Sequence, residues 1–188
     1  GMRIVLVHGA RPQLEQRLAQ HQLSLNYADH TPVTDSQAME CVKDAVGSVR
    51  ISIEALLSMG LSNSPMHGAR IRVVGGNFIT AKPFGIRAGI DFQYSGEVRK
   101  IDRAGIQSQL DDDAIVLLSS IGYSPTGEAF NLSYEDVATQ AAITLGAEKL
   151  IFLGAEPGLS DNSDRLIKSI NLSQAQQLLE KREEPALF

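Results

Sequence analysis

Short runs of consecutive apolar residues alternate along this chain with stretches in which apolar residues recur every three or four positions. The apolar runs are Arg3 to Val7, Ile71 to Val74, Ala114 to Leu118 and Lys149 to Leu153. Such runs are typical of strands buried on both faces of a mostly parallel sheet, and the periodic stretches are typical of helices. The alternation predicts an α/β fold, a three-layer α/β/α sandwich with a mostly parallel sheet.

Two helices are expected in the first third of the chain. One covers 13–20 and follows Pro12, which lacks an N–H and is tolerated in a first helical turn. The other covers 35–59, with Thr34 as its cap and Gly60 as its left-handed terminator.

Two more helices are expected in the last third. One begins after Ser133, has Asp136 at the position that bonds back to the cap, and ends at Gly146. The other runs from Ser173 to Arg182 and repeats the capping pattern with Ser173 and Gln176.

The middle of the chain has a different pattern. Residues 71–100 are β-like and are interrupted by Gly75, Gly76, Gly85, Gly89 and Gly96. This spacing predicts hairpins at the edge of the parallel sheet.

Charge and cysteine content narrow the class of protein. The 188 residues include 17 Lys and Arg against 22 Asp and Glu, a formal net charge of −5, which favours neither nucleic acid nor an anionic membrane as partner. No run approaches the roughly 20 apolar residues of a membrane span. The single cysteine, Cys41, excludes an internal disulfide and favours a reducing cytoplasm.

The turn from His8 to Pro12 is one candidate binding site. It joins a strand to a helix, and the free N–H groups at a helix start attract carboxylates and phosphates. Gly9, Ala10 and Arg11 would line such a site, with Arg11 adding positive charge. The alternative is that Gly9 simply permits a tight turn.

A second candidate lies around the helix that follows Ser133. Asn131 precedes this helix, and Glu135 and Asp136 fall in its first turn, where two carboxylates could position a cation or an ammonium group. The alternative is that Asp136 only completes the cap and Glu135 is a solvated acid. The four histidines lack ligand spacing, so no metal site is expected.

Several segments resemble the amino-acid kinase superfamily, within it acetylglutamate kinase and, more closely, N-acetylglutamate synthase. The segments are His8 to Gln13, Val33 to Asp35, Gly75 to Pro83, Ser95 to Asp102, Ser119 to Asn131 and Ala138 to Glu148. The resemblance covers most of the chain and implies an amino-acid-kinase-like fold.

In N-acetylglutamate synthase, an acetyltransferase domain moves an acetyl group from acetyl-coenzyme A to glutamate, the first step of arginine biosynthesis. A kinase-like domain binds feedback arginine and mediates assembly. The resemblance implies that residues 1–188 are a single, incomplete kinase-like domain, with the acetyltransferase domain outside this chain. It therefore implies no catalytic residue and no cofactor here, since acetyl-coenzyme A belongs to the other domain.

The resemblance also implies a small amino-acid ligand, namely arginine, glutamate or N-acetylglutamate. The expected pocket residues are Gly9, Ala10, Arg11, Asn131 and Glu135. A homo-oligomer is expected as well, because an incomplete domain leaves apolar surface exposed.

Charged groups of the kinase pattern are missing from this chain. The kinase's lysine-bearing loop has no counterpart before Arg3, and Pro32, Glu135 and Ala155 replace an arginine and two aspartates. Asn131 is retained. Because phosphoryl transfer depends on positioned charges, no kinase activity is expected. A working acetylglutamate kinase and a ligand-free interaction module are the alternatives.

Overall fold

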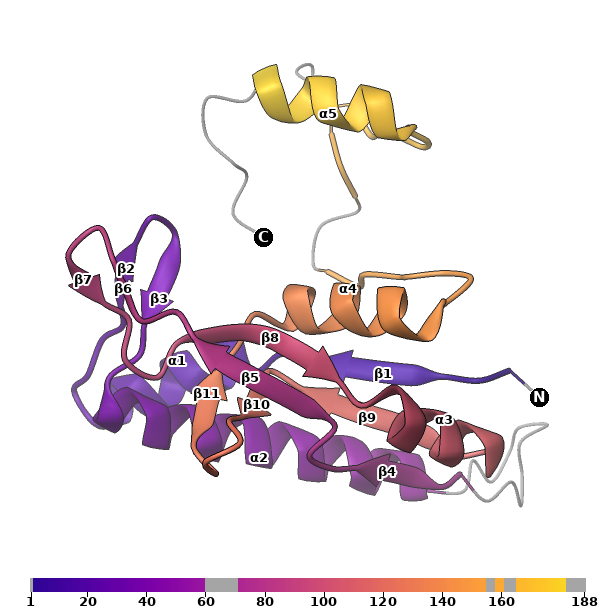
Figure 1. The fold of residues 1–188 in the computed structure, drawn as a ribbon, viewed down its shortest axis with the longest axis horizontal. Helices are drawn as coiled ribbons and strands as arrows, with labels where there is room; N and C mark the ends of the chain where they lie inside the picture. The colour runs from indigo at the N-terminus through magenta and orange to yellow at the C-terminus, as the bar shows by residue number, and fades with distance from the viewer. Residues whose placement is uncertain (1, 60–70, 155–157, 161–164, 182–188) are drawn as a thin grey trace. The chain divides into compact units, whose positions relative to one another are not determined.

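The computed structural model describes residues 2–59, 71–154, 158–160 and 165–181. The chain divides into a larger unit, residues 1–150, and a smaller unit, residues 151–188. Within the described residues, the larger unit contains the strands β1 to β11 and the helices α1 to α4, and the smaller unit contains α5 (Figure 1).

A parallel sheet of three strands confirms three of the predicted strands. Its order is β1 (Val5–His8), β9 (Ile115–Ser119) and β4 (Val73–Gly75). His8 pairs with Ser119, and Gly75 pairs with Leu117. Because the strands are parallel, their carboxyl ends meet at one edge, where ligands of open α/β sheets commonly bind.

The predicted hairpin region forms a second sheet and two small hairpins. The sheet has the order β11 (Ala129–Asn131), β10 (Ile121–Tyr123), β5 (Ile79–Pro83) and β8 (Gly96–Ile101). Only the pairing of β10 with β5 is parallel in this sheet. The hairpins are β6 (Ile86–Arg87) with β7 (Ile90–Asp91), and β2 (Asn26–Ala28) with β3 (Thr31–Val33).

Helices cover both faces of the strands, as the three-layer prediction requires. On one side lie α1 (Arg11–Gln20) and α2 (Ser36–Ser58), and on the other lie α3 (Arg103–Asp111) and α4 (Tyr134–Leu145) (Figure 1). The larger core cluster joins the sheets to α3 and α4 through residues such as Val116, Ile106 and Val137. Met39, Val42 and Ala45 of α2 build the core on the opposite side.

The capping residues in the sequence predicted the ends of α4 correctly but the start of α2 incorrectly. Ser133 Oγ accepts a hydrogen bond from the N–H of Asp136 at 3.1 Å, and Gly146 ends α4 with φ 66°, as predicted. The prediction that Thr34 caps α2 is wrong: Asp35 Oδ1 accepts from the N–H of Ala38 at 2.8 Å. Gly60 lies outside the described residues.

Two predictions near the end of the chain need correction. Residues 149–153 form no strand; their side chains are exposed, with Leu153 at 92%, and no strand among the described residues pairs with them. Helix α5 (Leu172–Lys181) is capped by Asn171 and Gln174 instead of Ser173 and Gln176, since Asn171 Oδ1 accepts from the N–H of Gln174 at 2.9 Å. Arg182 lies outside the described residues.

We predict that Ile106→Ala lowers the free energy of unfolding by about 3 kcal/mol, because Ile106 is completely buried and its truncation leaves a cavity. The matched control is Ile143→Ala, since Ile143 is 70% exposed, and its effect should stay within about 0.5 kcal/mol. Urea unfolding followed by circular dichroism measures both. Equal effects would contradict the assignment of the core.

Candidate functional site

The loop after β1 passes directly against the start of α4. A Cβ atom on Gly9 would lie 2.8 Å from Cδ1 of Tyr134, closer than real Cβ contacts. Glycine is therefore required by this close approach, which brings the start of α1 next to the start of α4. The structure thus places Gly9, Ala10 and Arg11 beside the turn that carries Glu135.

The start of α1 has no side-chain cap. Ala10, its N-cap residue, offers no hydrogen-bonding group, and Pro12 occupies the first turn. Arg11 is exposed and its Nε donates to Glu15 Oε1 at 3.1 Å along the same helix. This hydrogen bond raises the pKa of Arg11 above its usual value. The guanidinium is therefore held along α1 by Glu15.

Both acids at the start of α4 already have partners. Ser133 Oγ donates to Glu135 Oε2 at 2.6 Å. Asp136 Oδ2 accepts from the N–H of Val98 at 3.0 Å, so this carboxylate joins α4 to β8 instead of bonding back to the cap. The role of Asp136 is therefore structural but differs from the predicted alternative, because its carboxylate joins two elements instead of completing the cap. Glu135, in turn, is hydrogen-bonded and not simply solvated.

Tyr134 is the group most changed by these acids. Its pKa rises from 10.0 to about 12, first because its phenol hydrogen bonds to Glu135, then because of burial and the negative charge of that carboxylate. The phenol therefore stays protonated at neutral pH.

Asn131 is part of a buried polar network that sequence reasoning did not find. Its Nδ2 donates to Oγ1 of Thr34 at 3.0 Å, and the Oγ of Ser95 lies 2.8 Å from the same oxygen. Thr34 is completely buried, and only 1% of Ser95 is exposed. Ser95 Oγ also donates to the carbonyl of Pro32 at 2.6 Å. Asn131 therefore holds three distant segments together.

His8 ends β1 and is buried, with 7% of its surface exposed. Its Nδ1 lies 3.2 Å from the Gly9 carbonyl oxygen, and because a carbonyl only accepts, the ring nitrogen must donate. Nε2 is then an acceptor, and within the described residues nothing bonds to it. Burial lowers the pKa of His8, so the ring is neutral at physiological pH. The sequence marks His8 as the first residue of the candidate turn, but it does not predict that the ring is buried.

Metal-binding clusters and membrane-spanning helices are both absent from the described residues. No group of three or more His, Cys, Asp and Glu side chains is placed to hold a metal ion in that part of the chain. No helix there is long and apolar enough to cross a membrane.

The sequence pattern of the amino acid kinase family matches residues 1–184. This chain belongs to the amino acid kinase family. Its relatives include the amino-acid acetyltransferase of Azotobacter vinelandii (strain DJ / ATCC BAA-1303), 58% identical over 181 residues, 96% of this chain and 42% of the relative. The amino-acid acetyltransferase of Pseudomonas syringae pv. tomato is 56% identical, over 93% of this chain and 40% of its own length. The chain therefore spans less than half of these curated relatives.

Solved structures agree with the family assignment. N-acetylglutamate synthase from Neisseria gonorrhoeae, complexed with coenzyme A and L-arginine, matches with a TM-score of 0.86 and 34% identity, over 97% of this chain and 43% of that chain. The Streptococcus mutans UA159 protein smu.665 matches with a TM-score of 0.77 at 21% identity, over 95% of this chain and 70% of its own, which supports the fold alone.

The departures from the kinase pattern of the amino acid kinase family can be located in this structure. Pro32 lies in β3, where its carbonyl oxygen accepts a hydrogen bond from the Ser95 hydroxyl. Glu135 is held by Ser133. Ala155 lies outside the described residues.

We predict that Glu135→Gln lowers the pKa of Tyr134 from about 12 back toward 10.0, because the carboxylate that disfavours the phenolate is gone. NMR of ¹³C-labelled tyrosine rings measures this: at about pH 11, Tyr134 should be mostly protonated in the parent chain and mostly ionised in the variant. Tyr134→Phe assigns the signal, and Glu128→Gln, which changes an exposed acid elsewhere, is the control. An unchanged titration in Glu135→Gln would disprove this coupling.

Proposed function

We propose that this chain is the kinase-like regulatory and assembly domain of an N-acetylglutamate synthase, an enzyme that transfers acetyl from acetyl-coenzyme A to glutamate. The proposal rests on how much of this chain and how much of its relative the alignment covers. An amino-acid acetyltransferase matches 96% of this chain at 58% identity, yet only 42% of that relative is covered. In this proposal residues 1–188 are one incomplete kinase-like domain, and acetyl transfer takes place in a domain outside it.

The geometry of the candidate site supports regulation over phosphoryl transfer. Transfer of a phosphoryl group needs positive charges placed around the phosphates. At the loop after β1, Arg11 is paired with Glu15 along its own helix. At the start of α4, Glu135 adds negative charge next to that loop. A site of this composition suits an amino acid better than a nucleotide.

We propose a small amino acid as the ligand of this site: arginine, glutamate or N-acetylglutamate. Gly9, Ala10, Arg11, Asn131 and Glu135 would contact or shape the pocket. Structures of the Neisseria gonorrhoeae relative with L-arginine and with N-acetyl-glutamate support ligands of this class. No cofactor is proposed for this chain, since acetyl-coenzyme A would be used by the acetyltransferase domain. A cytoplasmic location is part of the same proposal.

A chimera tests the proposed function. The matching region of the Azotobacter vinelandii relative is replaced by this chain, and acetyl transfer to glutamate is measured with and without arginine. We expect an active chimera that arginine inhibits, and no ADP when this chain is given Mg-ATP and N-acetylglutamate. The relative with its matching region deleted is the control and should lose the response to arginine.

Two results would overturn the proposed function. Formation of ADP by this chain would establish the kinase alternative. A chimera that ignores arginine, under conditions in which the intact relative is inhibited, would show that this domain does not regulate.

The proposed assembly role is supported by an apolar surface on α2. Ile51, Leu56 and Met59 lie in the second half of this helix and its end, and their exposed fractions are 61%, 65% and 62%. Exposed apolar surface of this kind is typical of a contact between subunits. We propose that a second copy of the chain covers it in a homo-oligomer.

We predict that Leu56→Asp shifts the chain from an oligomer to a monomer, because a buried, unpaired carboxylate opposes association. Light scattering coupled to size-exclusion chromatography measures the mass of both. Ile143→Asp on α4 is the matched control, since Ile143 is 70% exposed, close to the 65% of Leu56, but lies outside this surface. A parent chain that is monomeric at all concentrations would contradict the assembly role.

A further inference from the structure

The hydrogen bonds around Thr34 can run in only one direction. The carbonyl oxygen of Pro32 can only accept, so the hydroxyl of Ser95, 2.6 Å away, must donate its proton to it. Ser95 Oγ itself accepts the backbone N–H of Thr34 at 3.0 Å. Because Ser95 has no second proton, the Thr34 hydroxyl must donate in the 2.8 Å contact between the two side-chain oxygens.

This order of donors fixes the side-chain amide of Asn131. Since Thr34 Oγ1 has given its proton to Ser95, it can only accept from Asn131, and the group 3.0 Å away must be the amide nitrogen. Thr34 is completely buried and Ser95 is 1% exposed, so water does not replace these partners. With Nδ2 directed to Thr34, the oxygen of the same amide is directed away from the network.

The amide oxygen of Asn131 is free to bind a ligand. Asn131 is partly buried, and within the described residues its Oδ1 bonds to nothing. In the same part of the chain, His8 Nε2 is the buried side-chain atom without a partner, so Asn131 Oδ1 is in contact with solvent. The group that Asn131 presents outward is therefore an acceptor, which favours a ligand atom that carries a proton.

Asn131 lies next to the loop after β1. Ile121 of β10 pairs with Asn131 and packs in one core cluster with Ala10, at the start of α1. The start of α1 has no side-chain cap, so its N–H groups suit the carboxylate of an amino acid. The outward oxygen of Asn131 and the negative charge of Glu135, in the first turn of α4, suit its ammonium group.

We propose that Thr34 and Ser95 are positioning residues, which hold Asn131 so that its Oδ1 accepts a hydrogen bond from the α-ammonium group of the ligand. The candidate site then binds an amino acid whose amino group is free and disfavours the N-acetylated form. An acetylated nitrogen has lost its positive charge and two of its three N–H groups. This inference rests on the proposed function, because it takes the candidate site as an amino-acid site.

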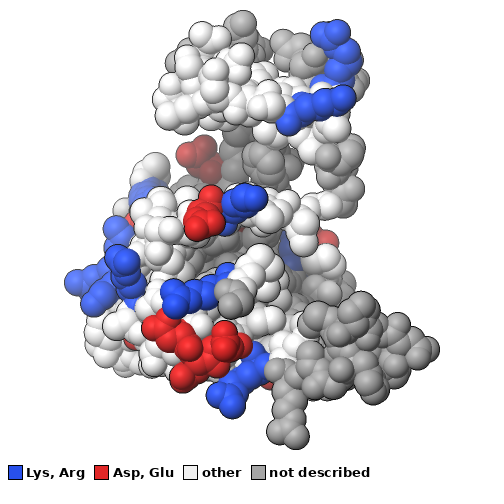
Figure 2. All heavy atoms as spheres, turned by 90° about the vertical axis from the view of Figure 1, so that its right-hand side faces the viewer, with Lys and Arg blue, Asp and Glu red and all other residues white. Residues whose placement is uncertain are grey.

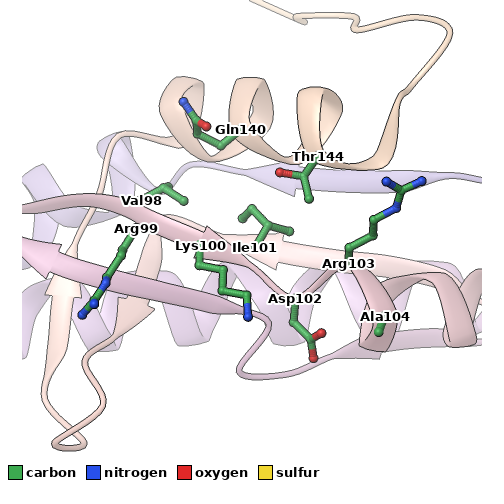
Figure 3. Close-up of a pocket in the computed structure, with 9 residues that line it drawn as sticks. All are labelled: Val98, Arg99, Lys100, Ile101, Asp102, Arg103, Ala104, Gln140 and Thr144. Carbon is green, nitrogen blue, oxygen red and sulfur yellow. The ribbon is translucent and has the colours of Figure 1, made fainter.

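A hollow between β8 and α4 does not offer this selectivity. Figure 3 shows Arg99 and Lys100 extending away from α4 and Arg103 rising on the other side, so these cations do not converge on one ligand. Figure 2 shows basic and acidic side chains together on one side of the molecule. Loose binding of a charged solute to such a surface is weak and needs its own control.

Isothermal titration calorimetry with L-glutamate and L-arginine, each compared with its Nα-acetyl derivative, tests the inference. At least one free amino acid binds, and its acetylated form binds about tenfold more weakly, because a hydrogen bond from a charged group is lost. Thr34→Val removes the acceptor that holds Nδ2 and lets the amide turn, so the ratio falls to about twofold. Thr34→Ser keeps the hydroxyl and restores the ratio of the parent chain.

Two variants are controls for these measurements. Thr31→Val changes a threonine of the same strand whose hydroxyl donates to the Asp29 carbonyl at 3.3 Å, outside the network, and it leaves the ratio unchanged. Arg103→Gln leaves both affinities unchanged, which excludes binding in the hollow beside β8. Circular dichroism establishes that each variant is folded. Ser95→Ala interrupts the same series of hydrogen bonds at a second residue and lowers the ratio in the same way.

Four results would overturn the inference: no binding of either free amino acid, equal affinity for the free and acetylated forms, an unchanged ratio in Thr34→Val and Ser95→Ala, or loss of binding in Arg103→Gln. Failure of the proposed function is read separately, from arginine inhibition of the chimera. A chimera that ignores arginine, together with a tenfold ratio in this chain, would remove the regulatory role and leave the selectivity of the site intact.

Discussion

The buried hydroxyl of Thr34 is the point at which the larger unit is tied together. It receives a hydrogen bond from Asn131, which is 97 residues away, and lies against Ser95, which is 61 residues away. A buried polar group without a partner costs about 1–3 kcal/mol, so these three residues must come together for the fold to be stable. Their meeting fixes the end of β3, the start of β8 and the end of β11 relative to one another. The starts of α2 and α4 follow within a few residues.

The polar groups around the loop after β1 and the charged groups on β8 differ in their surroundings. Around the loop after β1, the polar groups are used internally: Asn131 by Thr34, Glu135 by Ser133 and Asp136 by Val98. On β8, Arg99 and Lys100 are exposed to solvent. The groups around the loop after β1 therefore stabilise the fold, whereas the interactions of the exposed charges depend on the ionic strength of their surroundings.

Sequence reasoning succeeded where the signal is local and failed where it depends on a distant partner. The strands β1, β4 and β9 and the cap at Ser133 were predictable, because an apolar run or a capping residue acts within a few positions. The positions of Asn131 and Thr34 in one network were not predictable, since their contact spans most of the chain. Residues 149–153 have the composition of a strand, but a strand forms only when its backbone hydrogen bonds to a neighbouring strand. The burial of His8 could not be predicted, because it depends on how the whole chain folds.

Because Gly9 packs directly against Tyr134, the start of α1 and the start of α4 cannot move independently of each other. No β-carbon fits between the loop and the ring, so neither can move toward the other. A ligand that pushes the loop after β1 must also displace the first turn of α4. Asp136 in that turn is bonded to Val98, so the displacement would reach β8. The loop after β1, the first turn of α4 and the strand β8 are thereby linked in series, so that a shift at the first is transmitted to the last.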